Sequence, residues 1–437
     1  MSETIGETGP SRSSTFWTAL RDPALQLRIV DRLAALTAIM VPWSTTGVGV
    51  AATLWLIALV PTVEPRALLR SLTRPVSVLP IALFVLAVVG MLWSEAPWAL
   101  RLHGLSPIAK FLVLPLFVYH FERAPRGGLA VFIAFLASCA VLALVSCAVA
   151  FDPGLSIKQL FSRVPVAPTN GIFVKDYIDQ GQEFSLCAIA LAYPVLALLK
   201  EKRIREALLL ALIALGFVAN MMFVITSRTA LVTMPIMLAV FALLHLRLRV
   251  ALASLGVIIL LAVVVWFSSS QLRATIGKFF TDYHNTETLN LESGIGSRLI
   301  YWQKAVGFIG NAPVIGHGTG STRGLFEQAA VGETGARGQV VGNPHNQTLN
   351  VAVQWGVLGV ILLYAMWLTH LLLFRGEGLV AWIGLLVVVQ NVFTSLFNSH
   401  LFDFTEGWIY VVGVGVAAGM TLAARAGEPG SAKAIET

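Results

Sequence analysis

Residues 129–150 read LAVFIAFLASCAVLALVSCAVA, a run without a single charged side chain. About 20 consecutive apolar residues suffice for a helix to cross a membrane, whereas a transmembrane β-strand shows about ten residues of alternating polarity. Because this run is long and unbroken, it predicts a transmembrane helix. The fold class that we expect is therefore an all-α, polytopic membrane protein.

The rest of the 437-residue chain has the same character. Hydrophobic residues make up 57% of it and charged residues 12%, and its mean hydropathy is +0.79. A soluble domain carries about 25% charged residues. The composition therefore excludes a soluble enzyme, a disordered chain and a secreted disulfide scaffold. Its cysteines, Cys139, Cys147 and Cys187, all lie in apolar runs, so neither disulfides nor a zinc site are expected.

About twelve apolar segments of helical length follow one another along the chain. They cover residues 28–43, 46–62, 76–93, 104–120, 129–150, 183–199, 207–226, 229–245, 250–267, 347–374, 378–398 and 407–424. An even number puts both termini on one side of the membrane. The short loops on that side carry nearly all the loop Lys and Arg, and those on the other side carry only Arg101 and Arg228. The positive-inside rule then makes both termini cytoplasmic.

This topology divides the chain into five parts. Residues 1–27 form a cytoplasmic tail without the apolar core of a signal peptide. Residues 28–267 hold the first nine transmembrane helices and an outer loop at 151–182. A large outer loop with amphipathic helices spans residues 268–346. Residues 347–424 hold the last three helices, and 425–437 form a second cytoplasmic tail.

The stretch NPHNQTLNVAVQWGVLGVILLY, residues 343–364, is the most informative outside the plain apolar runs. It places His345 at the outer mouth of a helix, with Asn346 beside it as a cap or an orienting group. A lone interfacial histidine is commonly an anchor, but the polar cluster and Gln354 within the helix favour a functional role. A histidine pKa near 6.5 suits a general base.

Two arginines on the outer side are candidates for anion binding. Arg228 lies in the turn ITSRTALV, on the face where positive charge is otherwise avoided, so anion binding is favoured over snorkelling. Arg298 opens the predicted loop helix SRLIYWQKAVGFIG. There, backbone N–H groups and a guanidinium can together hold a phosphate, although an exposed arginine at a helix start is the alternative.

Two further cations are weaker candidates. Lys110 lies within the outer end of a helix, where a charge is costly and therefore often functional, although snorkelling explains it equally well. Arg323 follows the glycine-rich stretch GHGTGSTRG at 316–324. Its spacing is not that of a dinucleotide fingerprint and no strand precedes it, so we expect a tight turn rather than a phosphate cradle.

His400, Asp403 and Glu406 are potential metal ligands in the last outer loop. Three such residues in one short loop do not make a site, and the chain offers neither a DxD-like pair nor a His/Cys cluster. The sequence therefore predicts no metal and no cofactor.

These features together resemble the O-antigen ligase/polymerase superfamily. An arginine sits in a short turn between helices, another opens a helix of one large outer loop, and the pattern P-H-N-x-x-L…G-x-x-G enters the next helix. The resemblance is most specific over residues 296–362. It implies a GT-C-like glycosyltransferase of the bacterial inner membrane.

On this resemblance, the enzyme would transfer O-polysaccharide from undecaprenyl pyrophosphate to a sugar hydroxyl of lipid A-core at the periplasmic face. Arg228 and Arg298 would hold the pyrophosphate, His345 would be the catalytic base, and Asp403 would match an aspartate of the family's last periplasmic loop. No nucleic acid partner is expected.

Physical arguments point the same way. Outside the inner membrane no nucleotide sugar is present, so an activated donor must arrive on a lipid. Its pyrophosphate leaving group needs a metal or fixed cations, and this chain offers arginines.

Four functions remain open at this stage. Ligases, O-antigen polymerases and protein O-oligosaccharyltransferases share these motifs, and the ligase is favoured among them. A secondary transporter would usually show related halves and polar mid-membrane helices, which this sequence lacks.

Overall fold

The computed structural model describes residues 22–158, 171–225, 228–268, 270–294 and 296–427, and within these ranges it contains helices and no β-strand. This confirms an all-α polytopic architecture. The predicted tails at 1–21 and 428–437, and part of the predicted outer loop at 159–170, lie outside the described residues.

The helices fall into a body and an outer group. The body comprises α2 (Pro23–Met40), α3 (Thr45–Leu59), α4 (Pro65–Leu72), α5 (Pro75–Val89), α6 (Trp98–Ala109), α7 (Leu114–Arg123), α8 (Gly128–Phe151), α10 (Tyr177–Ala190), α11 (Ala192–Lys200), α12 (Ile204–Asn220), α13 (Arg228–His245), α14 (Leu248–Ser268), α18 (Gln347–Leu373), α19 (Leu379–Thr394) and α20 (Phe404–Gly427). The outer group comprises α15 (Ser270–Leu289), α16 (Gly296–Asn311) and α17 (Thr322–Ala329).

A helix lies at each of the twelve predicted segments, but the number of membrane spans is a separate matter. Among the described residues, seven helices are long and apolar enough to cross a membrane, or eight if α4 and α5, bent by 77°, count as one span. The structure therefore supports a polytopic membrane protein, and the count of twelve stays a prediction. The predicted division into five parts likewise stays a prediction.

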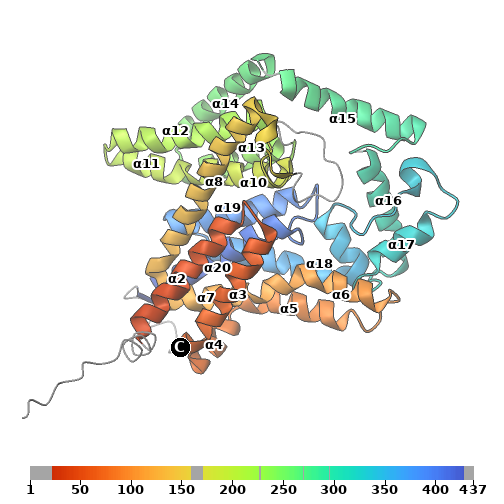
Figure 1. Cartoon of the computed structure of the whole chain (residues 1–437), viewed down its shortest axis with the longest axis horizontal. Coiled ribbons are helices and arrows are strands. Elements are labelled where there is room, and N and C mark those ends of the chain that lie inside the picture. The colour runs from red at the N-terminus through yellow and green to blue at the C-terminus, as the bar shows by residue number, and fades with distance from the viewer. Residues whose placement is uncertain (1–21, 159–170, 226–227, 269, 295, 428–437) are drawn as a thin grey trace, which may run out of the picture.

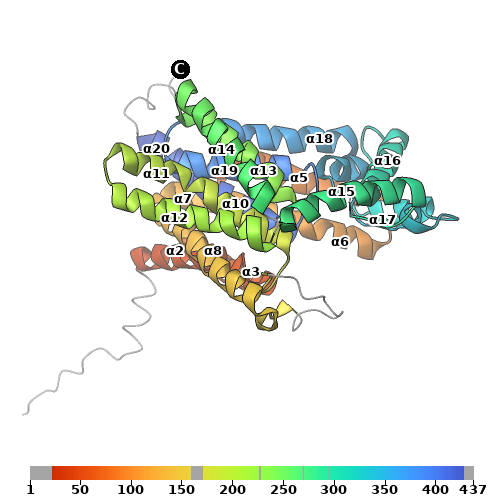
Figure 2. The same cartoon turned by 90° about the horizontal axis from the view of Figure 1, so that it is seen from above.

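The outer group lies at one end of the molecule. Figure 1 and Figure 2 both place α16 and α17 beside α18, with α15 running from α14 to α16, and α2 begins at the opposite end, where α20 finishes. The placement of both termini on one side of the membrane stays a prediction.

Helix α20 is the centre of the body: its residues from Thr405 to Gly419 are all buried, and it packs most extensively against α7. Its sequence YVVGVGVAAGM is rich in small residues, which allow helices to approach closely in a membrane. A β-carbon at Gly419 would lie 2.7 Å from the carbonyl oxygen of Val118 on α7. This packing holds α20 against α7, while the candidate site lies beside the opposite, N-terminal end of α20.

Helix α18 is broken at Gly356, whose φ of 59° and ψ of −153° are not helical. The outer loop fills the break: the N–H groups of His317 and Gly318 donate to the carbonyls of Val353 (2.9 Å) and Gln354 (2.8 Å). Backbone groups inside a membrane protein must be satisfied in this way. Residues 316–320 therefore form a tight turn whose N–H groups at 317–320 are engaged, and the turn fixes the outer loop to α18.

Replacing Gly356 with alanine is expected to destabilise the protein by about 2 kcal/mol or more. The left-handed conformation is strained for alanine, and the new β-carbon would collide with the carbonyl of Val314. The midpoint of thermal unfolding in detergent measures the effect. Gly216→Ala is the control because nothing lies within 4 Å of its β-carbon, and an equal midpoint in both variants would contradict the expectation.

Candidate functional site

His345 lies in a turn immediately before α18, in the left-handed conformation with a φ of 55°. Its N–H donates to Asn343 Oδ1 at 2.9 Å, which holds the turn. Asn346 caps α18 by accepting from Leu349 N at 3.0 Å, and its amide donates to the carbonyl of Leu396 at 3.0 Å. Strained backbone at a non-glycine residue often marks a functional site. Asn346 thus anchors the turn that presents His345.

The imidazole of His345 is held by an amide. Nδ1 of His345 lies 2.7 Å from Asn398 Oδ1, and Asn398 Nδ2 donates to Asp403 Oδ2 at 2.8 Å. The ring of Tyr301 flanks the imidazole, with centroids 6.2 Å apart. The structure therefore brings together two predicted residues, His345 and Asp403, through a third, Asn398, that the sequence analysis did not single out.

Buried charges surround Asp403. Nδ1 of His400 lies 3.4 Å from the carboxylate of Asp403 and 3.2 Å from that of Glu406. Burial disfavours a charged imidazole, but the carboxylates of Glu406 and Asp403 outweigh it and raise the pKa of His400 to about 10. The three ligand atoms lie within 4.8 Å of one another, a spacing that also suits a cation. A raised pKa favours a charged imidazole between the two carboxylates.

Lys110 contacts the loop that carries Asp403. Its ammonium is buried, donates to the carbonyl of Phe402 at 3.1 Å and also donates to the carbonyl of Asp403. Lys110 therefore holds the backbone that carries Asp403. These contacts give Lys110 a structural role in the site. A snorkelling lysine would not need them, and neither would a lysine that contacts substrate directly.

Replacing Lys110 with methionine is expected to destabilise the protein by about 2 kcal/mol, because one buried and one partly buried carbonyl lose their charged donor. The loop at Asp403 should then shift, and activity should fall as well. The control is Lys304→Met, since Lys304 also donates to two carbonyls but lies in the outer loop. Thermal unfolding midpoints compare the two, and a loss for Lys304→Met that equals or exceeds the loss for Lys110→Met would rule out this role.

Arg298 lies in the first turn of α16 and reaches the same loop. Its guanidinium Nη1 donates to the carbonyl of Phe397 at 2.9 Å, one residue before Asn398. Trp302, one turn further along α16, donates Nε1 to the carbonyl of Pro344 at 3.0 Å. Arg298 and His345 therefore both contact the loop between α19 and α20, at the adjacent residues Phe397 and Asn398.

The electrostatics keep His345 neutral. Burial lowers the pKa of His345 below its ordinary value of 6.5. Arg298 lowers it further, whereas the hydrogen bond with Asn398 and the charge of Asp403 oppose this effect. A neutral imidazole near pH 7 can accept a proton.

Arg323 and Arg228 are the remaining predicted residues. Arg323 is exposed on α17 and pairs with Glu327 at 2.9 Å, as residues four apart on a helix commonly do. The backbone of Arg228 begins α13, but its side chain lies outside the described part of the structure. The predicted roles of both arginines stay predictions.

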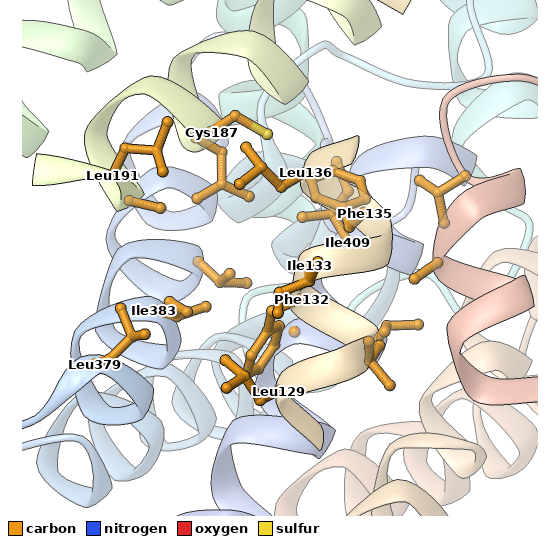
Figure 3. Close-up of a pocket in the computed structure, with 18 of the residues that line it drawn as sticks. Leu129, Phe132, Ile133, Phe135, Leu136, Cys187, Leu191, Leu379, Ile383 and Ile409 are labelled. Carbon is orange, nitrogen blue, oxygen red and sulfur yellow. The ribbon is translucent and has the colours of Figure 1, made fainter. Parts of the chain in front are cut away.

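A pocket of about 340 Å³ lies elsewhere, among α2, α8, α10, α19 and α20 (Figure 3). The side chains that point into it are apolar, among them Leu129 and Ile133 of α8 and Ile383 of α19. It can hold hydrocarbon but offers no group that would bind a pyrophosphate. The polar site at His345 is therefore distinct from this pocket.

Part of this chain matches a known family. Residues 208–364 match the family model described as O-antigen ligase, and this stretch includes Arg228, Arg298 and His345. Asn398 and Asp403 lie beyond the match. No curated protein matches the chain. The chain therefore carries an O-antigen ligase family domain over residues 208–364.

Proposed function

We propose that this protein is an inner-membrane glycosyltransferase that joins O-polysaccharide, carried on undecaprenyl pyrophosphate, to a sugar hydroxyl of lipid A-core. The site faces the periplasm and both termini are cytoplasmic. His345 is the general base, and Arg298 and Arg228 bind the pyrophosphate. The transfer inverts the anomeric carbon, because the acceptor attacks it directly, and needs no metal.

One observation carries the proposal: Arg298 and His345, both inside the O-antigen ligase match, contact adjacent residues of one loop beyond it, Arg298 at Phe397 and His345 at Asn398. A base and a fixed cation close together suit this chemistry. An acceptor hydroxyl is a poor nucleophile until a base takes its proton, and a departing pyrophosphate develops charge that a guanidinium can stabilise. An interfacial anchor would need neither the hydrogen bond from the imidazole to Asn398 nor an arginine on the same loop.

The experiment that tests the function is reconstitution in liposomes with purified protein, undecaprenyl-pyrophosphate-linked glycan, lipid A-core and a chelator. A ladder of glycosylated lipid A-core is expected. Lengthening of the lipid-linked glycan alone would identify a polymerase, and movement of the glycan across the membrane without product would identify a transporter. Activity that needs added divalent cation would refute metal independence and would point to the His400, Asp403 and Glu406 cluster.

The pH profile of transfer should show a single acidic limb. The neutral form of His345 is the active one, and burial lowers the pKa of this residue. We therefore expect kcat/KM to fall only as the pH drops through a value below 6.5, and to be level above it. Initial rates between pH 5 and 8 measure this profile, and a limb centred above 6.5 would contradict the assignment.

A further inference from the structure

The amide of Asn398 lies between the imidazole of His345 and the carboxylate of Asp403, 2.7 Å from the first and 2.8 Å from the second. We propose that Asn398 is a positioning residue that fixes which nitrogen of His345 carries the proton, with its own orientation set by Asp403. The proposal rests on the proposed function, since it concerns how the base of that reaction is prepared.

The chemistry of the three groups dictates the direction of both hydrogen bonds. A carboxylate accepts hydrogen bonds and cannot donate them, so the amide must turn its NH₂ group toward Asp403. The amide oxygen then faces His345, and since this oxygen also only accepts, Nδ1 of His345 must carry the proton. Nε2 is left with the lone pair. The carboxylate of Asp403 thus makes Nε2 of His345 the basic nitrogen through one amide.

Three polar groups contact Asp403. Nδ1 of His400 lies 3.4 Å from it, Asn398 donates to it, and Lys110 binds its backbone carbonyl. The charged groups that act on His345 itself are Arg298 from α16 and, from the loop before α20, Asp403 and His400. Asp403 and Asn398 therefore connect His400 and Lys110 to the imidazole of His345.

An amide has an advantage over a second carboxylate in this position. A carboxylate directly against an imidazole favours the charged form and raises its pKa by roughly 1–3 units. An amide orients the ring without adding a full charge beside it. His345 can then remain neutral, and so basic, near pH 7.

The first test exchanges the two partners. Asn398→Ala removes the contact, and Asn398→Asp sets two carboxylates against each other. Each should lower kcat by about 10- to 100-fold, with the KM for donor little changed. The double variant N398D/D403N restores an amide facing a carboxylate in the reverse order. It should recover at least about tenfold over N398D, with the acidic limb of its pH profile moved upward by roughly one unit.

The outcomes of this exchange separate the two explanations. If Asn398 only fills space, N398D/D403N should be no more active than N398D and its pH profile should not move. Either result would overturn the proposal. A loss in N398A that appears in the KM for donor instead of kcat would also overturn it.

The second test does not depend on activity. The rate at which diethyl pyrocarbonate modifies His345, followed by mass spectrometry without substrate, rises with the neutral fraction of the imidazole. Its midpoint should move upward by roughly one unit in N398D/D403N. Asn290→Asp is the matched control. Asn290 also makes two hydrogen bonds through its amide, to Thr334 O at 2.7 Å and from Arg337 N at 3.1 Å, but none to His345.

The two readouts distinguish failure of the positioning role of Asn398 from failure of the proposed function. An unmoved midpoint in N398D/D403N would overturn the positioning role of Asn398 whatever the enzyme does. A moved midpoint in a protein whose His345→Ala variant remains active would keep the positioning role and remove His345 as the base.

Discussion

Replacing His345 with alanine is expected to lower glycosyl transfer by about 10²- to 10⁴-fold, the usual contribution of a general base. The acceptor hydroxyl would then have no group within the site to take its proton. Transfer to lipid A-core in liposomes measures the loss. The protein should still be expressed and inserted, because the contacts between helices of the body do not involve this side chain.

The backbone at His345 calls for a second substitution. Its φ of 55° is energetically unfavourable for alanine, whereas asparagine adopts this left-handed conformation more readily. His345→Asn should therefore be as inactive as His345→Ala, with a smaller effect on thermal unfolding. His284→Ala, at an exposed histidine of α15, should transfer at the normal rate. Substantial activity in His345→Asn would remove the imidazole from the mechanism.

The helices were predictable because the signal for each is local. An apolar run such as residues 129–150 can only be satisfied in a membrane as a helix, and α8 spans Gly128–Phe151 in the structure. The ends of helices were less predictable, since capping depends on single residues. The bend between α4 and α5 falls at Pro75, where a proline at the first position begins a new helix.

The candidate site could be predicted only in part. His345 and Arg298 stand out because each is polar at the start of a helix. Asn398 gave no such signal, since its role depends on lying 53 residues from His345 in sequence and 2.7 Å from it in space. Lys110 is a stronger example: its partners at Phe402 and Asp403 are almost 300 residues away. Periodicity and motifs do not encode such contacts.

The large outer loop shows the same limit. A tight turn at residues 316–320 was expected from its glycines. A helix break in a membrane is tolerated only where another segment satisfies its backbone. That the turn at residues 316–320 would be this segment for the break at Gly356 could not be expected, because no local pattern shows which distant segment fills a break. The docking explains how a loop of this length can hold Arg298 in a fixed position near His345.

Replacing Arg298 is expected to weaken the use of donor by about 10²-fold, the usual cost of removing one group that stabilises developing charge. Arg298→Ala removes the charge altogether. Arg298→Lys keeps it, but an ammonium does not reproduce the two parallel hydrogen bonds that a guanidinium can make to a phosphate. We therefore expect both variants to lose kcat/KM for donor, with alanine the more affected, while the KM for lipid A-core stays unchanged.

The hydrogen bond from Arg298 to the carbonyl of Phe397 offers a competing explanation, because its loss could displace Asn398. Direct binding of undecaprenyl pyrophosphate separates the two. If Arg298 binds the pyrophosphate, both variants should bind this lipid more weakly than the unaltered protein, and Arg337→Lys, at an exposed arginine of the same outer loop, should bind normally. If Arg298 only positions the loop, the affinity should be unchanged while kcat falls as it does in Asn398→Ala. That second pattern would move Arg298 from the donor to the support of His345.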